Sequence, residues 1–324
     1  MTFRSQEDAL KQSISAFNGG YYEIALPALE ALEQSKPQVA RFYLARIYAD
    51  NEGAYTDHVK AYKLYNELAL ALQDVDPDDD ELAPVAAKAL TAVSMYLRAG
   101  LTEANLKPDV AAADQALQRA ALTFNNEDAQ FELAKVLLRG EGPDIPLGGA
   151  DDPASKIENG SHWLSRLSRS GHSGAQAFLA DLMWRGKFVA KDQASALNLI
   201  DVAVANAPAQ ERVWIEDIYQ NIFCNAGEGV RQQATGRVAE WHDRYGRHAE
   251  KRADKSGLDT LAAAPVRTCA NGEVVRPMSL QASGGSAAPA AAPALPQPAS
   301  PPGVHSLAPS GAMRDIGTGF APAR

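Results

Sequence analysis

One helix-sized phrase returns four times along this chain of 324 residues, and it constrains the fold more than any other feature. The phrase starts with Ala, has Leu or Val four residues later, and places a small residue directly after that position. Its two most similar copies, AQFELAKVLLRG at 129–140 and AQAFLADLMWRG at 175–186, agree at half of their positions. Because a single helix pair cannot bury its apolar face alone, repetition at steps of roughly forty residues predicts a solenoid of stacked helix pairs.

The positions shared by these copies fall on one stripe of a helix. A small residue in the stripe, such as Ala134 or Ala180, lets a neighbouring helix approach closely, and the closing Gly favours a left-handed C-cap. A second helix is predicted after each copy, because an Asp-x3-Ala pattern follows. Its carboxylates stand where an N-cap belongs, at Asp57, Asp109 and Asp192.

The chain divides by composition into three parts: a solenoid over 1–255, a short extension over 256–280 and an Ala/Pro-rich tail over 281–324. In the solenoid, Asp80 is expected to cap the helix that follows an acidic linker, and a long polar loop is expected to end at a helix over Ser161 to Ser170. The last pair, predicted over Ala209 to Asn225 and Val230 to Lys251, lacks the small-residue phrase and suits a terminal cap.

In the extension, residue types alternate on both sides of Asn271-Gly272, and this pattern predicts a two-stranded hairpin from Val266 to Val275. The chain has two cysteines, Cys224 and Cys269, which either form one disulfide or remain free thiols, depending on the compartment. The tail is dominated by Ala, Pro, Gly and Ser and is predicted to be disordered.

Composition and spacing argue against several function classes. The net charge of -9, without basic residues interleaved with aromatic ones, disfavours nucleic acid as a partner. No apolar run is long enough to insert into a membrane. The six scattered histidines and the two cysteines form no metal set, and the acidic stretch after Asp74 lacks the Gly and Glu of a calcium loop. Gly171-His172-Ser173 follows a helix rather than a strand, so it is not a nucleophile elbow. No cofactor is expected.

The repeat phrases resemble the Sel1-like repeat, a relative of the tetratricopeptide repeat that has Gly-His-x-x-Ala between units, as at Gly171 to Ala175. The resemblance covers about residues 6–250. Within that family the chain is similar to the ExoR-type negative regulators of exopolysaccharide synthesis, through MYLRAGLTEANLKPD (95–109), NNEDAQFELAKVLLRGEG (125–142) and VWIEDIYQNIF (213–223). This implies an all-α, right-handed superhelix of about six Sel1-like helix pairs, with no enzymatic activity.

By the same resemblance, the function is that of a periplasmic repressor that binds the periplasmic domain of a membrane sensor histidine kinase. Proteins of that type are exported with a cleaved signal, whereas Met1-Thr-Phe-Arg runs almost directly into the first helix. A cytoplasmic location therefore stays open if that start is genuine. The alternative is a scaffold of a cell-envelope or polysaccharide secretion assembly, which predicts a lipid anchor. A Sel1-like hydrolase would need many regularly spaced cysteines.

The binding surface of such a solenoid is expected on its concave face, which the first helix of each pair forms. Arg, Tyr and Trp are common anchors of protein interfaces, and they recur on these helices beside the Ala/Leu/Val core stripe. The predicted protein-binding residues are Arg41, Tyr43, Arg46, Lys135, Arg139, Trp184 and Arg185.

Overall fold

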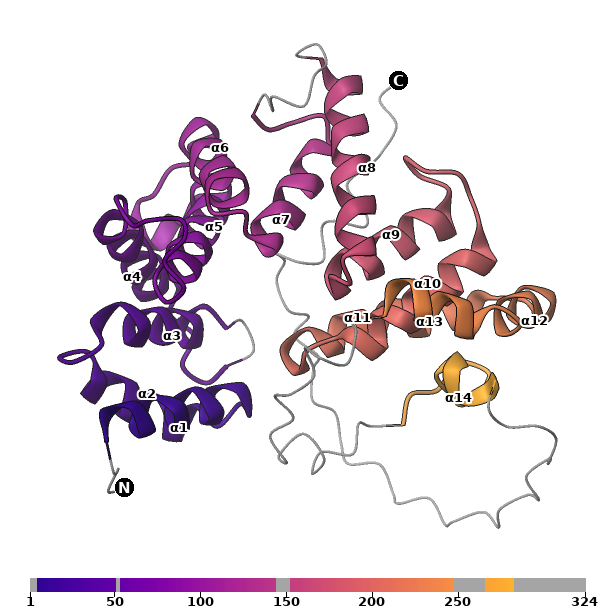
Figure 1. The fold of residues 1–324 in the computed structure, drawn as a ribbon, viewed down its shortest axis with the longest axis horizontal. Coiled ribbons are helices and arrows are strands. Elements are labelled where there is room, and N and C mark those ends of the chain that lie inside the picture. The colour runs from indigo at the N-terminus through magenta and orange to yellow at the C-terminus, as the bar shows by residue number, and fades with distance from the viewer. Residues whose placement is uncertain (1–4, 51–52, 144–151, 247–265, 283–324) are drawn as a thin grey trace.

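The computed structural model describes residues 5–50, 53–143, 152–246 and 266–282, and over these ranges the chain is built from α-helices (Figure 1). Within the same ranges, β-structure is limited to two isolated bridges, Leu101–Leu106 and Thr268–Val274. The prediction of an all-α solenoid is confirmed, because consecutive helices pair and the pairs stack.

Six helix groups follow one another along the chain. Their bounds are α1 (Gln6–Asn18) with α2 (Tyr22–Leu32), α3 (Pro37–Ala49) with α4 (His58–Ala71), α5 (Ala83–Ala99) with α6 (Val110–Gln118), α7 (Glu127–Leu137) with α8 (Pro153–Arg169), α9 (Ser173–Arg185) with α10 (Gln193–Asn206), and α11 (Ala209–Asn225) with α12 (Glu228–Thr235) and α13 (Val238–Tyr245). A 3-10 turn at Thr102–Ala104 precedes α6, a π turn at Arg119–Thr123 extends it, and a short helix, α14, spans Met278–Ala282.

The repeated phrase forms the core of the first helices as predicted. Its leading and small residues, among them Ala129, Ala134, Ala175 and Ala180, are fully buried. The closing glycines adopt positive φ, with values of 73° at Gly100, 75° at Gly140 and 70° at Gly186, which side-chain-bearing residues adopt at a cost.

The predicted aspartate caps are also present. The Oδ1 atoms of Asp57, Asp109 and Asp192 each accept a backbone N–H at 3.0 Å from the residue three positions later. Each carboxylate therefore satisfies one of the free donors in the first turn of α4, α6 or α10.

Three element boundaries differ from the sequence predictions. The N-cap of α5 is Leu82, which makes no side-chain cap hydrogen bond, rather than Asp80, and Oδ1 of Asp79 accepts the N–H of Leu82 at 2.8 Å in the turn before the helix. Helix α8 starts at Pro153 rather than at Ser161, because Asp152 caps it and Pro153 occupies the first turn. The last helix is two helices, α12 and α13, broken at Gly236.

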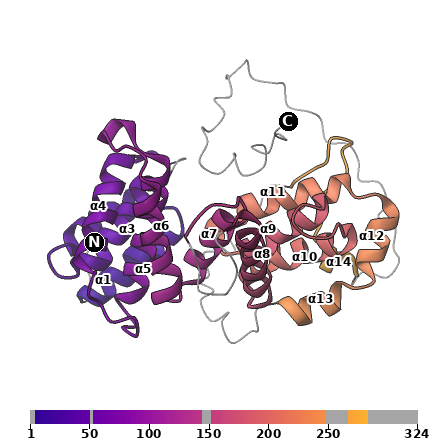
Figure 2. The same ribbon diagram turned by 90° about the horizontal axis from the view of Figure 1, so that it is seen from above.

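The first helices lie in one layer. Helix α1 packs on α3, α3 on α5, α5 on α7, and α9 on α11, whereas α7 and α9 meet through side chains such as Phe131 and Phe178. Each second helix packs on its own partner and on the next first helix. Figure 1 shows α1 to α6 in one limb of an arch and α8 to α13 in the other, with α7 between them, and Figure 2 shows the same order from above. We call the surface that the first helices form the concave face, after the curvature that stacked helix pairs of this kind adopt.

The last described segment, residues 266–282, packs on the final pair, and we call it the strap. In place of the predicted two-stranded hairpin, its backbone forms a turn with the single bridge Thr268–Val274, with Gly272 at a φ of 83° and the N–H of Cys269 donating to the carbonyl of Glu273 at 2.8 Å. The side chain of Met278 is fully buried in the core formed by α10 to α13. The part of the predicted tail from residue 283 onward lies outside the described residues.

Candidate protein-binding surface

The N-terminal end of the concave face is an aromatic cluster around Arg46. The guanidinium carbon of Arg46 lies 4.6 Å from the ring centroid of Phe17 on α1 and 5.7 Å from that of Phe42 on α3. Tyr43 packs edge-on against Phe17 with a centroid distance of 5.2 Å, and burial raises the pKa of its hydroxyl. Two of the predicted residues, Tyr43 and Arg46, are thus brought together by the apolar rings of the first two pairs.

At the centre of the concave face, Asp128 connects three successive first helices. Its carboxylate accepts from Nε2 of His172, at the start of α9, at 3.2 Å, and pairs with Nζ of Lys88 on α5 at 3.7 Å. Nδ1 of His172 accepts the N–H of Ala175 at 3.1 Å, so the ring proton resides on Nε2. The hydrogen bond from His172, followed by the charges of Lys88 and Arg46, lowers the pKa of Asp128 below its ordinary value.

Because the charge of Arg46 lowers the pKa of Asp128, the two side chains interact electrostatically.

Further polar contacts join the ends of other first helices. Lys36, before α3, pairs with Glu81, before α5, at 2.9 Å, and the hydroxyl of Ser173 donates to Glu211 of α11 at 3.0 Å. These contacts fix neighbouring repeats relative to one another.

Aromatic side chains continue along the second half of the concave face. Phe131 of α7 packs edge-on against Phe178 of α9 at a centroid distance of 6.0 Å. Gly174 lies between two rings, since a Cβ placed there would be 3.1 Å from Phe131 and 3.4 Å from Trp214 of α11. The absence of a side chain at Gly174 therefore allows the aromatic rings of three successive first helices to approach one another.

The other predicted cations are already paired with carboxylates. Lys135 is mostly buried, 2.5 Å from Glu132 and over the ring of Phe131, whereas Arg139 is exposed and 3.3 Å from Glu141. Arg185 is exposed and pairs with Asp181 at 2.9 Å. These side chains belong to α7, α9 and the turns that follow them.

Two of the predicted residues lie apart from this group. Arg41 forms an ion pair with Glu33, just after α2, at 3.1 Å. Because five residues separate Arg41 from Arg46, their side chains leave α3 in directions about 140° apart around the helix axis. Trp184 packs against the hydrophobic core formed by α9 to α13. Its contribution to any interface is therefore coupled to the packing of the last two repeats.

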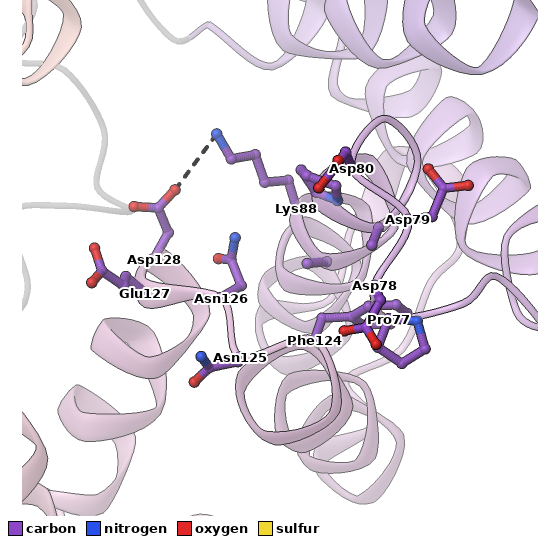
Figure 3. A pocket seen from close by; sticks show the side chains of 13 residues that line it. Pro77, Asp78, Asp79, Asp80, Lys88, Phe124, Asn125, Asn126, Glu127 and Asp128 are labelled. Atoms are coloured by element: carbon purple, nitrogen blue, oxygen red, sulfur yellow. Dashed lines mark ion pairs between the residues drawn. The ribbon is translucent and has the colours of Figure 1, made fainter. Parts of the chain in front are cut away.

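An acidic groove opens beside Asp128, between the linker before α5 and the start of α7. It has a volume of about 740 Å³. Figure 3 shows Lys88 reaching from α5 to Asp128, while Asp78, Asp79 and Asp80 extend from the linker. Among the described residues no group of His, Cys, Asp or Glu has the arrangement of a metal site.

The strap is attached by covalent and polar contacts. Cys224 of α11 and Cys269 form a disulfide with an S–S distance of 1.99 Å. Asp201 of α10, buried at 2% exposure, accepts the backbone N–H of Met278 at 2.6 Å and hydrogen-bonds Nε2 of His242 at 2.9 Å. The sequence signals the pairing through its two cysteines, but it carries no local signal for the role of Asp201.

The arrangement of the described residues is that of a binding scaffold: an extended concave face with aromatic and charged side chains on stacked first helices. None of the helices in the described ranges is both long and apolar enough to cross a membrane. The protein is thus an all-α repeat protein built from stacked helix pairs. It resembles the ExoR-type negative regulators of exopolysaccharide production, as the comparisons with known proteins show.

Two relatives carry the name exopolysaccharide production negative regulator. The protein of Rhizobium leguminosarum bv. viciae is 29% identical over 227 residues, which cover 70% of this chain and 79% of that protein. The protein of Rhizobium meliloti (strain 1021) is 27% identical over 224 residues, which cover 69% of this chain and 77% of that protein. No family model matches the chain.

Among solved structures, the chain is similar to a protective antigen of uropathogenic Escherichia coli strains that displays an SLR fold. The TM-score is 0.46 with 19% sequence identity, over 82% of this chain and 50% of that one. The chain thus spans half the length of that antigen.

Proposed function

We propose that this protein is a non-enzymatic regulator that acts by binding another protein through its concave face. The observation that carries the proposal is the layer of first helices, with aromatic rings from α1, α3, α7, α9 and α11 and with charged side chains beside them. The names of the two rhizobial relatives support a role in the negative regulation of exopolysaccharide production.

The partner in this proposal is the periplasmic domain of a membrane sensor histidine kinase of a two-component system, and the protein is a periplasmic repressor that keeps this kinase inactive. The disulfide between Cys224 and Cys269 supports an oxidising compartment. Binding of the repressor to the sensor domain lowers exopolysaccharide synthesis, and loss of the repressor raises it.

The biochemical test measures binding of the purified protein to the periplasmic domain of the sensor kinase from the same genome. Replacing Arg139, Trp184 and Arg185 together by Ala should weaken binding by at least about 2 kcal/mol, near thirtyfold. Because Trp184 packs into the core, the double variant Arg139→Ala/Arg185→Ala is measured beside it. A matched control is Lys63→Ala/Arg169→Ala, which removes two exposed cations from the second helices α4 and α8.

The cellular test deletes the gene and measures secreted polysaccharide. Secreted polysaccharide should rise in the deletion strain and return to the wild-type level when the wild-type gene is supplied. It should stay high when the gene of the double variant is supplied instead. Unchanged polysaccharide together with an envelope assembly defect would instead favour the scaffold function. Equal binding by the double variant and the control pair would exclude these cations as part of the interface.

A further inference from the structure

One cation on the concave face, Arg46, lies over two aromatic rings and has no carboxylate partner among the described residues. The exposed Arg212 of α11 also makes no ion pair there, whereas four other cations of the first helices and their ends are each matched with an acid. The pairs are Lys88 with Asp128 at 3.7 Å, Lys135 with Glu132 at 2.5 Å, Arg139 with Glu141 at 3.3 Å and Arg185 with Asp181 at 2.9 Å. Arg46 contacts two aromatic rings and makes no ion pair with any described residue.

The rings that hold Arg46 are themselves fixed. Phe17 is 3% exposed and Phe42 is 6% exposed, so neither ring can move without disturbing the core. Phe17 is further packed by Tyr22 and Tyr43, at centroid distances of 5.7 Å and 5.2 Å. Stacking restricts the guanidinium plane before any partner arrives, and this restriction removes part of the entropy cost of binding.

The chemistry of a stacked guanidinium determines what it can accept. Its carbon lies over both rings, and the N–H edge of a guanidinium is a planar fork of donors that matches a carboxylate in a bidentate arrangement. The surroundings favour a single negative charge over a polyanion, because the chain carries a net charge of -9 and Asp128 lies within electrostatic reach. An isolated Asp or Glu side chain on a protein partner satisfies both conditions.

We propose that Arg46, packed on the rings of Phe17 and Phe42, is the anchor for one Asp or Glu side chain of the protein that binds the concave face. The proposal rests on the proposed function in so far as the concave face binds a protein. It adds the chemistry of the contact: a bidentate ion pair at the N-terminal end of the face, formed by an arginine that is already positioned.

The first experiment measures binding of the sensor kinase periplasmic domain to three variants of the full chain. Arg46→Gln, which removes the charge, should weaken binding at least about tenfold, and Arg46→Lys, which keeps the charge but loses the fork, should weaken it less. The matched control is Arg166→Gln on the second helix α8. Arg166 also stacks on a ring, that of Trp163 at 4.8 Å, and has no ion pair with described residues. The control should bind like the wild type.

A second experiment separates this inference from the identity of the partner. A displayed library of random peptides is selected on the wild type and on Arg46→Gln. The wild type should enrich peptides with Asp or Glu at a fixed position, and the variant should lose that enrichment. Should the sensor domain fail to bind the wild type, the proposed partner is wrong, while the peptide selection still decides the role of Arg46.

Thermal unfolding of each variant accompanies both experiments. If Arg46→Gln does not fold, Arg46→Lys carries the peptide test, and a weaker preference for acidic residues is the expected result. The proposal is overturned if the wild type enriches no peptides or peptides without an acidic position. It is equally overturned if the variants lower the melting temperature but select the same acidic peptides, because Arg46 would then contribute to packing alone.

Discussion

At the scale of single residues, two helix backbones approach each other closely at Gly160, where α8 crosses α7. A Cβ at this position would lie 2.9 Å from both the carbonyl oxygen of Ala134 and the backbone nitrogen of Leu138. Since both atoms belong to the backbone, neither can move aside cheaply. The small residue of the repeated phrase and the glycine of the next helix therefore act together to set the distance between the two helices.

Gly160→Ala should consequently destabilise the protein by about 1–3 kcal/mol through overpacking, although Ala favours a helix by up to about 1 kcal/mol. Gly229→Ala in α12 is the matched control, because no atom lies within 4 Å of a Cβ placed there. Urea unfolding followed by circular dichroism measures both. Two equally stable variants would show that the packing of α7 on α8 is looser than described.

Two carboxylates on the concave face should respond to pH in opposite directions. The pKa of Asp128 is lowered by its hydrogen bond with His172, so its ionised form stabilises the fold above the ordinary value of 3.8, and this stabilisation is lost as the pH falls below 3.8. Burial raises the pKa of Asp181 above 3.8, so its ionised form opposes folding at neutral pH, and the opposition fades as the pH falls.

Asp128→Asn should therefore melt below the wild type at pH 7, and the gap should narrow only as the pH falls below 3.8. Asp181→Asn should melt at or above the wild type at pH 7, and this difference should shrink as the pH falls toward 3.8. Melting temperatures measured from pH 7 to below 3.8 test both variants together. A lower melting temperature for Asp181→Asn than for Asp128→Asn at pH 7 would contradict the assigned directions.

At the scale of elements, the strap is held to the last pair at several points. Besides the disulfide, the hydroxyl of Tyr219 donates to the carbonyl of Arg276 at 2.8 Å, and Arg267 pairs with Glu216 at 3.2 Å. The strap thus covers the end of the solenoid. Without it, the apolar surface of the last pair, which a further repeat would cover, would be exposed.

Breaking the disulfide should destabilise the cap. The two cysteines are separated by 45 positions, and a closed loop of this size is worth about 4 kcal/mol in the chain-entropy model. Unfolding by urea with and without a reducing agent measures the effect, and Cys224→Ser/Cys269→Ser is the control that should not respond to the reductant. Free thiols in periplasmic material, detected by alkylation and intact mass, would show that the bridge does not form in the cell.

At the scale of the whole molecule, the strap belongs to the same folded unit as the last helix pairs. A chain that stops after residue 255 loses the disulfide, the buried Met278 and the N–H partner of Asp201, whereas a chain that stops after residue 282 retains all three. The shorter chain should melt at a lower temperature than the full chain, and the longer one at the same temperature. Equal melting temperatures of the two truncated chains would contradict this prediction.

The amino-acid sequence alone determined the repeat, the buried stripe of the first helices, the aspartate caps and the glycine ends. All of these are local, because each depends on residues within one or two turns of a helix. The sequence also identified Arg46 and Tyr43 as candidate surface residues, since Arg and Tyr at first-helix positions outside the core stripe are recognisable from spacing.

What depends on residues distant in the chain required the folded structure. The early start of α8 is stabilised by the close fit of Gly160 against Ala134, the role of Asp128 requires Lys88 and His172 from other repeats, and the capping of α14 by Asp201 spans 77 positions. The state of each cation on the concave face, paired or packed on rings, is likewise set by side chains that meet through the stacking of repeats. A sequence pattern records which residues are present, whereas the charge that a surface leaves unmatched is a property of how its elements pack.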